Sequence, residues 1–304
     1  MFLFRQGPAG GSVVITVLLN GGLGNQLFQY AAGRALAEKH DVELLLDLSR
    51  LQHPKPGDTP RCFELAPFNI KASLLAEEGR QPLGSYQACM HRLLLKASIP
   101  LWGSIILKEQ GCGFDPLIFR APSSCILDGF WQSECYFKQI TSLLQQELSL
   151  KAPSPALRKA SSVLSDATVA VHVRRGDYVT NPAAASFHGI CSQDYYQAAV
   201  ANILTSYPDS QFLVFSDDPA WCQEHLDLGQ PFRLAADFGL NGSAEELVLI
   251  SRCAHQIIAN SSFSWWGAWL NPSPHKLVVA PCRWFTDPAI TTNDLLPETW
   301  VRLP

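Results

Sequence analysis

The stretch Val169-Ala-Val-His-Val-Arg-Arg-Gly-Asp-Tyr178 is a short β-branched apolar run that ends directly in two arginines, a glycine and an aspartate. Alternating valines of this kind are typical of a buried strand in a parallel sheet. In open α/β sheets, ligands bind in the crevice beyond the carboxyl ends of the strands, which is where Arg174 and Arg175 fall. Because a guanidinium is a planar, permanently charged fork of donors, it matches two phosphate oxygens at once. The stretch therefore predicts an α/β fold with a site for an anionic ligand.

The polar residues of this stretch have two interpretations. In the first, Arg174 stabilises a departing diphosphate, and His172 and Arg175 are further ligand contacts. In the second, a strand-end arginine forms a structural ion pair with a nearby carboxylate such as Asp177. The whole set favours the ligand site. Asp177 is also a candidate general base by location, although two neighbouring arginines lower the basicity of its carboxylate and favour a role in orienting them.

A glycine-rich loop, with Gly22, Gly24 and Asn25, lies between the first expected strand and the first expected helix. With Asp47 at the end of the next strand, the loop is similar to a dinucleotide-binding fingerprint. Leu27 stands where the third glycine would be, which disfavours a nicotinamide or flavin enzyme. Glycines let a backbone approach a sugar or a phosphate closely. The simpler interpretation is a glycine turn with Asn25 as the helix N-cap.

The segment Asn260-Ser-Ser-Phe-Ser264 is a second candidate for phosphate binding. A strand ending at Ala259 runs into small hydroxyl residues, and a helix is expected next, so backbone N–H groups and the positive helix end would meet the ligand. The predicted ligand contacts are Asn260, Ser261, Ser262 and Phe263. Aromatic residues after a helix start usually pack inside, so we expect three tryptophans to belong to the core: Trp265, Trp266 and Trp269.

Two further segments carry carboxylates. In Ser216-Asp-Asp218-Pro219, both aspartates are candidate ligand contacts, but Pro219 suits a first helical turn with Asp218 as its cap. Ser243-Ala-Glu-Glu246 has the spacing of a capping box, in which Glu246 reaches back to the backbone N–H of Ser243. The sequence contains no Asp-x-Asp, so we expect no metal clamp on a diphosphate.

Composition limits the function classes. The 304 residues are 47% hydrophobic and 16% charged, which is ample material for one large or two ordinary domains. A net charge of −4 argues against a nucleic-acid partner. Nine scattered cysteines without a CxxC pair are typical of a reduced cytoplasmic protein. No apolar run approaches the roughly 20 residues of a transmembrane helix, so we expect a cytoplasmic location, with membrane contact limited to a peripheral one through a lipid-linked glycan.

Strands and helices alternate along the chain. Strands are expected over residues 13–19, 43–47, 101–107, 125–127, 168–173, 212–215, 256–259 and 277–280, and helical material over 26–38, 74–99 and 137–148. A proline-containing linker at residues 151–155 separates two such halves. We therefore expect one α/β domain at residues 1–150 and a second at 151–304.

Four other blocks accompany the opening stretch in a fixed order. They are Gly21-Gly-Leu-Gly-Asn-Gln-Leu-Phe-Gln-Tyr-Ala-Ala-Gly-Arg-Ala-Leu-Ala37, Gly129-Phe-Trp-Gln-Ser-Glu-Cys-Tyr-Phe137, Ser216-Asp-Asp218 and Ile258-Ala-Asn-Ser-Ser-Phe-Ser-Trp-Trp-Gly-Ala-Trp-Leu270. Together the five blocks resemble an α-1,2-fucosyltransferase of glycosyltransferase family 11. The early first strand resembles the bacterial branch of that family.

This resemblance implies a GT-B-type architecture of two facing Rossmann-like domains, the first on the acceptor side of the cleft and the second binding the donor. It implies an inverting galactoside 2-α-L-fucosyltransferase, which moves L-fucose from GDP-fucose to the 2-hydroxyl of a terminal galactose in a glycan, with no metal or other cofactor. Gly22, Gly24 and Asn25 would line the cleft opposite the donor. The Glu246 carboxylate would read guanine, with His172 at another edge of the base, or else Glu246 only closes its capping box.

Composition and spacing alone lead only to a diphosphate-linked ligand; the fucose, the guanine nucleotide and the linkage come from the resemblance. A noncatalytic protein that binds a nucleotide sugar or a glycan is one alternative. A related transferase with another sugar or linkage is the other.

Overall fold

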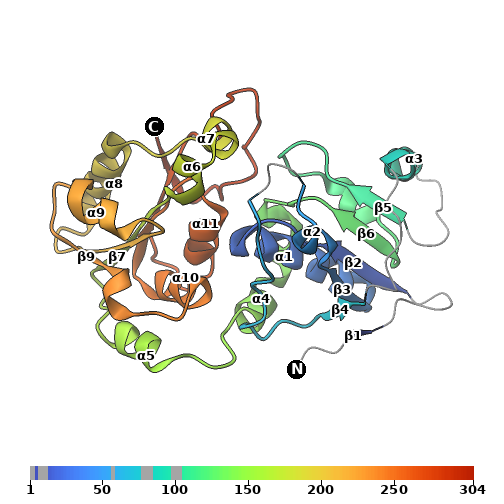
Figure 1. Cartoon of the computed structure of the whole chain (residues 1–304), viewed down its shortest axis with the longest axis horizontal. Helices are drawn as coiled ribbons and strands as arrows, with labels where there is room; N and C mark the ends of the chain where they lie inside the picture. Colours follow the sequence, from blue (N-terminus) through green and yellow to red (C-terminus); the bar gives the residue numbers. More distant parts are fainter. Residues whose placement is uncertain (1–3, 6–12, 56–58, 77–84, 97–104) are drawn as a thin grey trace. The chain divides into compact units, whose positions relative to one another are not determined.

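The computed structural model describes residues 4–5, 13–55, 59–76, 85–96 and 105–304. The chain forms two compact α/β units (Figure 1). The first comprises Met1–Leu148 with Thr291–Leu295, and the second comprises Ser149–Ile290 with Leu296–Pro304. Each unit contains one six-stranded sheet in which every strand pair is parallel. The short return of Thr291–Leu295 to the first unit had no signal in the sequence.

The sheet of the first unit has the strand order β1-β4-β3-β2-β6-β5. Its strands are β1 (Phe4–Arg5), β4 (Ser73–Leu75), β3 (Glu43–Asp47), β2 (Val14–Leu18), β6 (Cys125–Asp128) and β5 (Ile105–Lys108). The chain moves outward from β2 through β3 to β4, and later returns on the other side of β2 through β5 and β6. The strand order therefore reverses between β2 and β6.

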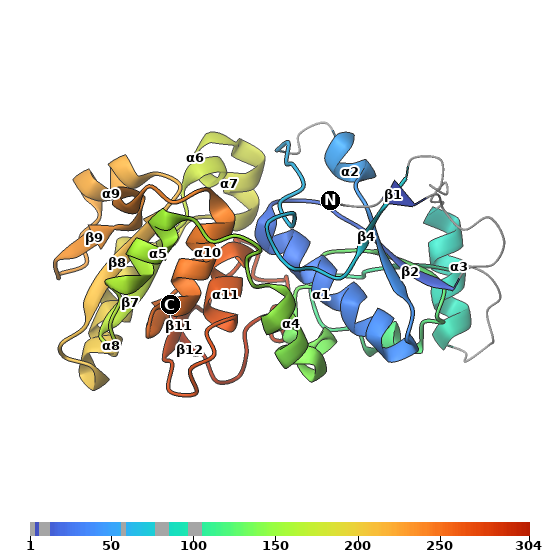
Figure 2. The same ribbon diagram turned by 90° about the horizontal axis from the view of Figure 1, so that it is seen from below.

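Helix α1 (Leu23–His40) packs against β2 and β3 of this sheet (Figure 2). It is buried over most of its length, and its buried residues include Gln26 and Gln29 as well as apolar side chains. Gly33 allows the close approach, because a Cβ there would overlap the side chain of Val17. The other helices of the unit are α2 (Ser49–Gln52), α3 (Ser85–Lys96) beside β5, α4 (Thr141–Glu147) and the 3₁₀ turns η2 (Pro116–Arg120), η3 (Glu134–Tyr136) and η4 (Lys138–Ile140).

The sheet of the second unit has the order β12-β11-β10-β7-β8-β9. Its strands are β12 (Val301–Leu303), β11 (Val278–Pro281), β10 (His255–Ile257), β7 (Thr168–Val173), β8 (Gln211–Ser216) and β9 (Phe232–Leu234). The chain moves from β7 outward through β8 to β9 and then returns to β10 on the other side of β7. The reversal between β7 and β10 repeats the one between β2 and β6.

Both faces of this second sheet are covered by helices. Val169, Val171 and Val173 form one core with α8 (Gln193–Ser206) and α9 (Pro219–His225). On the opposite side of the sheet lie α10 (Ser243–Arg252) and α11 (Ser262–Trp269), with α5 (Pro155–Ser162) packed on α10 (Figure 1). The remaining elements are α6 (Gly176–Thr180), α7 (Pro182–His188) and the 3₁₀ turn η5 (Ala235–Phe238). Because β7 is buried on both faces, its sequence is an almost unbroken apolar run.

The expected elements match the structure where the apolar pattern is long. The strands at 43–47 and 168–173 are confirmed to the residue, and the others to within a few residues. The helical expectation for 74–99 is wrong at its start, where Ser73–Leu75 form β4, while residues 77–84 and 97–104 lie outside the described residues. In the helix expected at 137–148, the 3₁₀ turn η4 precedes α4. The three-residue strands β4, β9 and β12 were missed because so short a run has no readable period.

Candidate functional site

The candidate site lies in the second unit, where the strand order reverses. The carboxyl ends of β7 and β10 are neighbours in the sheet. Arg174 follows β7, and the segment Asn260–Ser262 follows β10. The crevice at such a reversal is the usual ligand site of open α/β sheets. Tertiary structure thus brings together two of the segments that the sequence singled out.

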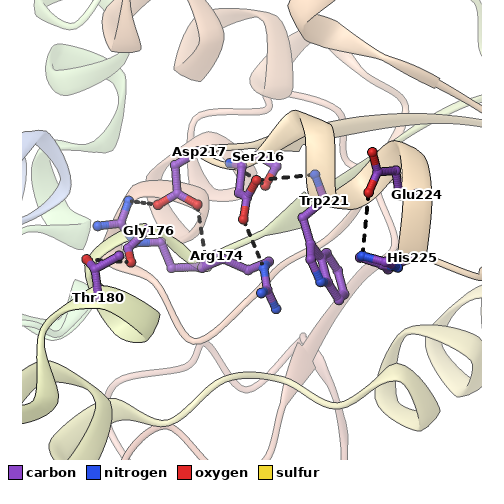
Figure 3. Close-up of polar contacts among 10 residues, drawn as sticks. Arg174, Gly176, Thr180, Ser216, Asp217, Trp221, Glu224 and His225 are labelled. Carbon is purple, nitrogen blue, oxygen red and sulfur yellow. Dashed lines mark hydrogen bonds and ion pairs between the residues drawn. The ribbon is translucent and has the colours of Figure 1, made fainter.

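Arg174 is paired with a carboxylate of the neighbouring strand end. Its Nη1 lies 2.8 Å from Oδ2 of Asp217, which follows β8 (Figure 3). Both side chains stay partly accessible, at 20% and 26% exposure. The Arg174 guanidinium also lies over the ring of Tyr178, 5.3 Å from its centroid. The ion pair considered for this arginine therefore forms with Asp217; the side chain of Asp177, in α6, lies outside the described part of the structure.

Asp217 also holds the turn from β7 into α6. Its Oδ1 accepts a hydrogen bond of 2.9 Å from the backbone N–H of Arg175. Gly176 allows this approach, because a Cβ at that position would overlap Oδ2 of Asp217. One carboxylate thus fixes both the backbone beside Arg174 and its guanidinium.

Arg175 has different partners from Arg174. Its guanidinium stacks on Trp221, 3.7 Å from the ring centroid, and its Nε lies 3.3 Å from Oδ2 of Asp218. Asp218 caps α9 by accepting from the backbone N–H of Trp221, and Pro219 occupies the first turn, as the sequence predicted. Arg175 and Asp218 are therefore engaged in holding α9 against the sheet.

His172 is the penultimate residue of β7, and its side chain lies on the face of the sheet that α11 covers. It is only 4% exposed, and its ring centroid lies 5.4 Å from that of Phe263. Burial, together with the positive charge of Arg174, lowers the pKa of His172 to about 3. Its Nδ1 has no hydrogen-bond partner among the residues that the structure describes. A buried neutral imidazole with an unused nitrogen can bind a polar ligand group.

Helix α11 presents its amino end to the same reversal point. Ser261 is its N-cap residue, yet its side chain does not cap the helix. The first-turn amides of a helix have no intrahelical acceptor, so those of Ser262 and Phe263 are suited to an anion. Both residues are half-buried. The tryptophans that follow are buried, which confirms them as core residues: Trp265, Trp266 and Trp269.

Asn260 has a structural role that the sequence did not indicate. Its side chain is 3% exposed, and its Nδ2 donates to the backbone oxygens of His188, Gly189 and Trp284, at 2.9, 3.3 and 3.2 Å. Its Oδ1 accepts from the Cys191 thiol. The amide therefore anchors the loop after α7.

The capping box expected at Ser243 and Glu246 is wrong. The N-cap of α10 is Gly242, with a φ of 78°, and no side chain caps that end of the helix. The helix begins one residue earlier than the pattern implied, so Glu245, not Glu246, occupies the third helical position. Its Oε2 accepts from the backbone N–H of Asn241 at 2.9 Å, and both its oxygens accept from Ser154, each at 2.8 Å.

Glu246 is left with a different environment. It is half-buried, and burial, followed by the negative charge of Asp217, raises the pKa of its carboxyl. Glu246 therefore belongs electrostatically to the group that contains Asp217 and Arg174.

The glycine loop of the first unit differs from expectation in one detail. Helix α1 begins at Leu23 with Gly22 as N-cap, so the assignment of Asn25 as N-cap is wrong. Asn25 lies inside the helix, where its Oδ1 accepts from Nε2 of Gln132 at 2.8 Å, and Gly24 is buried. Gly21 carries the positive φ, 77°, that requires a glycine. The paired glycines in the sequence were the signal for that turn.

The described residues contain no group of three or more His, Cys, Asp or Glu side chains arranged to hold a metal ion. Across those same residues, no helix combines the length and apolar character needed to span a bilayer.

Comparison with known proteins gives consistent relatives. The model of the family Glycosyl transferase family 11 matches residues 116–303. The chain is 32% identical to the O-antigen biosynthesis glycosyltransferase WbnK of Escherichia coli, over 94% of this chain and 99% of that protein. It is 31% identical to an alpha-1,2-colitosyltransferase of the same organism, over 95% and 99%. A galactoside alpha-(1,2)-fucosyltransferase 2 of Pongo pygmaeus is 35% identical over 34% of this chain and 30% of its own length.

Among solved structures, FUT1 of Arabidopsis thaliana in complex with GDP aligns with a TM-score of 0.50 at 12% identity. The alignment covers 89% of this chain and 71% of that one. This likeness concerns the fold alone. With two parallel Rossmann-like sheets and this neighbour, the expected α/β class of the GT-B type is confirmed.

Proposed function

The chain belongs to glycosyltransferase family 11, and from this membership we propose that it transfers L-fucose from GDP-fucose to the 2-hydroxyl of a terminal galactose in a glycan, with inversion at the sugar. The observation that carries the donor side is the placement of Arg174 at the reversal point between β7 and β10, beside the amino end of α11. A nucleoside diphosphate needs charged and backbone donors of this kind.

The proposed chemistry is charge stabilisation at the leaving group. As the sugar–oxygen bond breaks, negative charge grows on the β-phosphate. A hydrogen-bond donor accelerates the step if it binds the phosphate more strongly in the transition state than in the ground state. Arg174 would supply a bidentate contact, and the amides of Ser262 and Phe263 the backbone donors. Asp217 supports this role, because its 2.8 Å contact holds the guanidinium in place until the diphosphate arrives.

The proposed base-binding part of the site uses His172 and Glu246. Lowering of its pKa keeps His172 neutral, so it can act as a donor or acceptor without repelling a cationic neighbour. Glu246 has a carboxylate that, with the capping box ruled out, has no structural duty at its own helix end. A carboxylate suits the adjacent N1–H and N2–H donors of guanine. Phe263, whose ring is tilted against that of His172, would contact the plane of the base.

The acceptor hydroxyl must lose a proton during transfer. Asp177 is our candidate for receiving it, because α6 begins immediately after Arg174 and Arg175. Those two cations lower the basicity of a carboxylate beside them, which favours orientation of the arginines as its alternative duty. A variant series at Asp177 with a pH profile distinguishes the two, since only a base shifts the acidic limb of the profile.

A second donor is favoured by a specific observation. An alpha-1,2-colitosyltransferase is 31% identical over nearly the whole chain. Colitose is fucose without its 3-hydroxyl, so the two donors differ by one polar group. Incubation of the purified protein with GDP-fucose, GDP-colitose and other nucleotide sugars, with lactose as acceptor and NMR of the product linkage, tests the proposal. Binding of a nucleotide sugar with neither glycosidic product nor hydrolysis would favour the noncatalytic alternative.

We further propose that the enzyme works in the cytoplasm on a galactose-ended glycan. For a lipid-linked glycan, the lipid would stay in the membrane and the enzyme would contact that membrane only peripherally. All eight cysteines that the structure describes are free thiols, which supports a reducing compartment. No nucleic-acid partner is proposed, given the net charge of −4.

A further inference from the structure

The first unit has its own reversal point, topologically equivalent to the donor site of the second. Strand β2 pairs with β3 on one side and with β6 on the other, as β7 pairs with β8 and β10. The carboxyl ends of β2 and β6 lead into two loops, residues 19–22 and 129–133. A crevice at this position is a ligand site in open α/β sheets. The family resemblance implies that the first unit is on the acceptor side, but it does not identify a residue that holds the acceptor sugar ring.

The two loops are tied to each other by side chains of α1. Gln29 accepts from the backbone N–H of Asn20 at 3.0 Å and donates to the backbone oxygen of Gly129 at 3.1 Å. Asn25 accepts from Gln132 at 2.8 Å. Both amide side chains bridge from the helix to a loop residue, so the loops are held in one arrangement.

Glu109 holds the second loop, residues 129–133, through two hydrogen bonds to its backbone. Its Oε2 accepts from the backbone N–H of Phe130 at 2.6 Å, and its Oε1 from that of Trp131 at 2.8 Å. Gly129 makes room for the carboxylate, because a Cβ there would overlap the side chain of Glu109. Because one carboxylate accepts from two successive backbone N–H groups, the backbone at Phe130 and Trp131 is held in one orientation.

The loop also contains a strained residue. Trp131 has a φ of 57°, in the left-handed region that a bulky side chain rarely adopts. Its ring is fully buried and packs edge-on against Tyr136, with centroids 5.5 Å apart. Its Nε1 has no hydrogen-bond partner in the described part of the chain. Strain of this kind persists where the surroundings over-determine it, and it concentrates at ligand sites.

Phe130 is the exposed residue of this loop. Its neighbours Gly129 and Trp131 are buried or tightly packed, yet Phe130 is 40% exposed. A rigid, exposed aromatic ring matches the C–H face of a pyranose such as galactose. The two loops contain no lysine or arginine of their own, although the side chain of Arg61 lies near Gly22, and Arg50 forms an ion pair with Asp128 at the end of β6. The choice of a neutral sugar therefore rests on the exposed ring of Phe130.

We propose that Phe130 is the stacking platform of an acceptor-sugar subsite at the reversal point of the first unit, and that Glu109 is the positioning residue that presents it to a galactose-ended glycan. This inference rests on the proposed function, which requires a galactoside acceptor. It adds the residues that bind that acceptor.

The test uses the full chain and four variants. Phe130→Ala removes the platform, and Phe130→Tyr retains the ring. Leu93→Ala is the matched control, because Leu93 is an exposed apolar residue of the same unit, 59% exposed on α3. Glu109→Gln replaces one of two acceptor oxygens by a donor that faces a backbone N–H. Each variant is measured for acceptor KM, donor KM, kcat and GDP affinity.

We expect Phe130→Ala to raise the acceptor KM by about tenfold, in keeping with the loss of one aromatic stacking contact. GDP affinity and donor KM should stay unchanged, Phe130→Tyr should restore the acceptor KM, and Leu93→Ala should have no effect. Glu109→Gln should raise the acceptor KM with GDP affinity intact. A Phe130→Ala protein with wild-type acceptor KM would overturn the inference, and so would a parallel loss of GDP affinity.

A donor-free experiment separates this inference from the proposed function. Saturation-transfer NMR with methyl β-galactoside and wild-type protein should show transfer to the ring protons of the sugar, and Phe130→Ala should abolish it. A signal that survives in Phe130→Ala, or is absent from the wild type, counts against the subsite. Failure of the proposed function shows instead as absent fucosyl product in the nucleotide-sugar panel, whatever the galactoside signal.

Discussion

Arg174 and Asp217 form an ion pair of 2.8 Å between residues that follow adjacent parallel strands. The same aspartate accepts from the backbone N–H of Arg175. In the proposed mechanism, the guanidinium that meets the diphosphate is therefore oriented beforehand by a carboxylate that also competes for it. Both effects can be measured.

Arg174→Lys should abolish most turnover while the fold survives. Lysine keeps the charge but loses the planar fork, so the bidentate contact to the β-phosphate fails. We expect kcat to fall by about 10²–10³-fold, the usual effect of removing one donor to a developing negative charge. Steady-state kinetics with circular dichroism checks this, with Arg233→Lys on the exposed edge strand β9 as control. Near-normal kcat in folded Arg174→Lys would remove Arg174 from the mechanism.

Asp217→Asn should separate donor binding from turnover. The amide oxygen can still accept from Arg175, but the negative charge beside the diphosphate site is gone. GDP should bind a few-fold more tightly, because Arg174 loses its internal competitor, and kcat should drop by about tenfold because its guanidinium is no longer oriented. Calorimetric titration of GDP and initial rates give the two values. Weaker GDP binding by Asp217→Asn would assign Asp217 a direct contact with the donor.

Glu246→Gln and Glu245→Gln form a matched pair of adjacent substitutions. If Glu246 reads guanine, its glutamine variant should bind GDP about tenfold more weakly, because a donor then faces a donor. Glu245→Gln should leave GDP affinity intact and lower the melting temperature, because Glu245 holds Asn241 and Ser154. Equal GDP affinity in both variants would retire the guanine-reading role of Glu246.

The pKa of Glu246 also predicts a pH effect on stability. A carboxyl whose pKa is raised on folding binds its proton more tightly in the native state, so the native state loses stability as pH rises from the ordinary glutamate range through the raised value. Glu246→Gln removes that loss. Urea unfolding at pH 4 and pH 7 should show the variant gaining stability relative to wild type at the higher pH. A constant difference would contradict a raised pKa.

His172 predicts the opposite dependence. Its pKa falls from 6.5 to about 3 on folding, so the unfolded chain binds the proton first as pH drops. Stability from this residue is complete above pH 6.5 and decreases below it, by about 1.4 kcal/mol for each pH unit in the steep part of the window. His172→Gln should flatten the urea-unfolding profile between pH 6.5 and pH 5. An unchanged slope would mean that His172 already titrates in the native protein.

Activity should persist in excess EDTA. In the proposed site, Arg174 and the amides of Ser262 and Phe263 supply the positive charge that a divalent cation would otherwise bring to the diphosphate. Initial rates with EDTA, and with added Mg²⁺ or Mn²⁺, measure this. Complete loss on chelation that either cation restores would show that the donor site is built differently.

Some elements of this protein could be predicted from its sequence because they depend on neighbouring residues alone. The apolar run at 168–173 specifies a buried strand whatever surrounds it, and Asp218 with Pro219 specifies a helix start, because both depend on residues within one turn of each other. The five sequence blocks indicated the family for the same reason. Each is a contiguous stretch whose pattern can be recognised without knowing what it contacts.

The tertiary structure decided which residues meet. Val173 pairs with Ser216 in the register of β7 and β8, and this register alone places Arg174 beside Asp217, 43 residues away. The left-handed Gly242 moved the start of α10 by one residue and exchanged the duties of Glu245 and Glu246. Strand register and backbone φ are set by the packing of whole sheets and helices. A sequence therefore determined the elements of this protein and its family, whereas the partner of each charged group depended on contacts that form only when distant strands align.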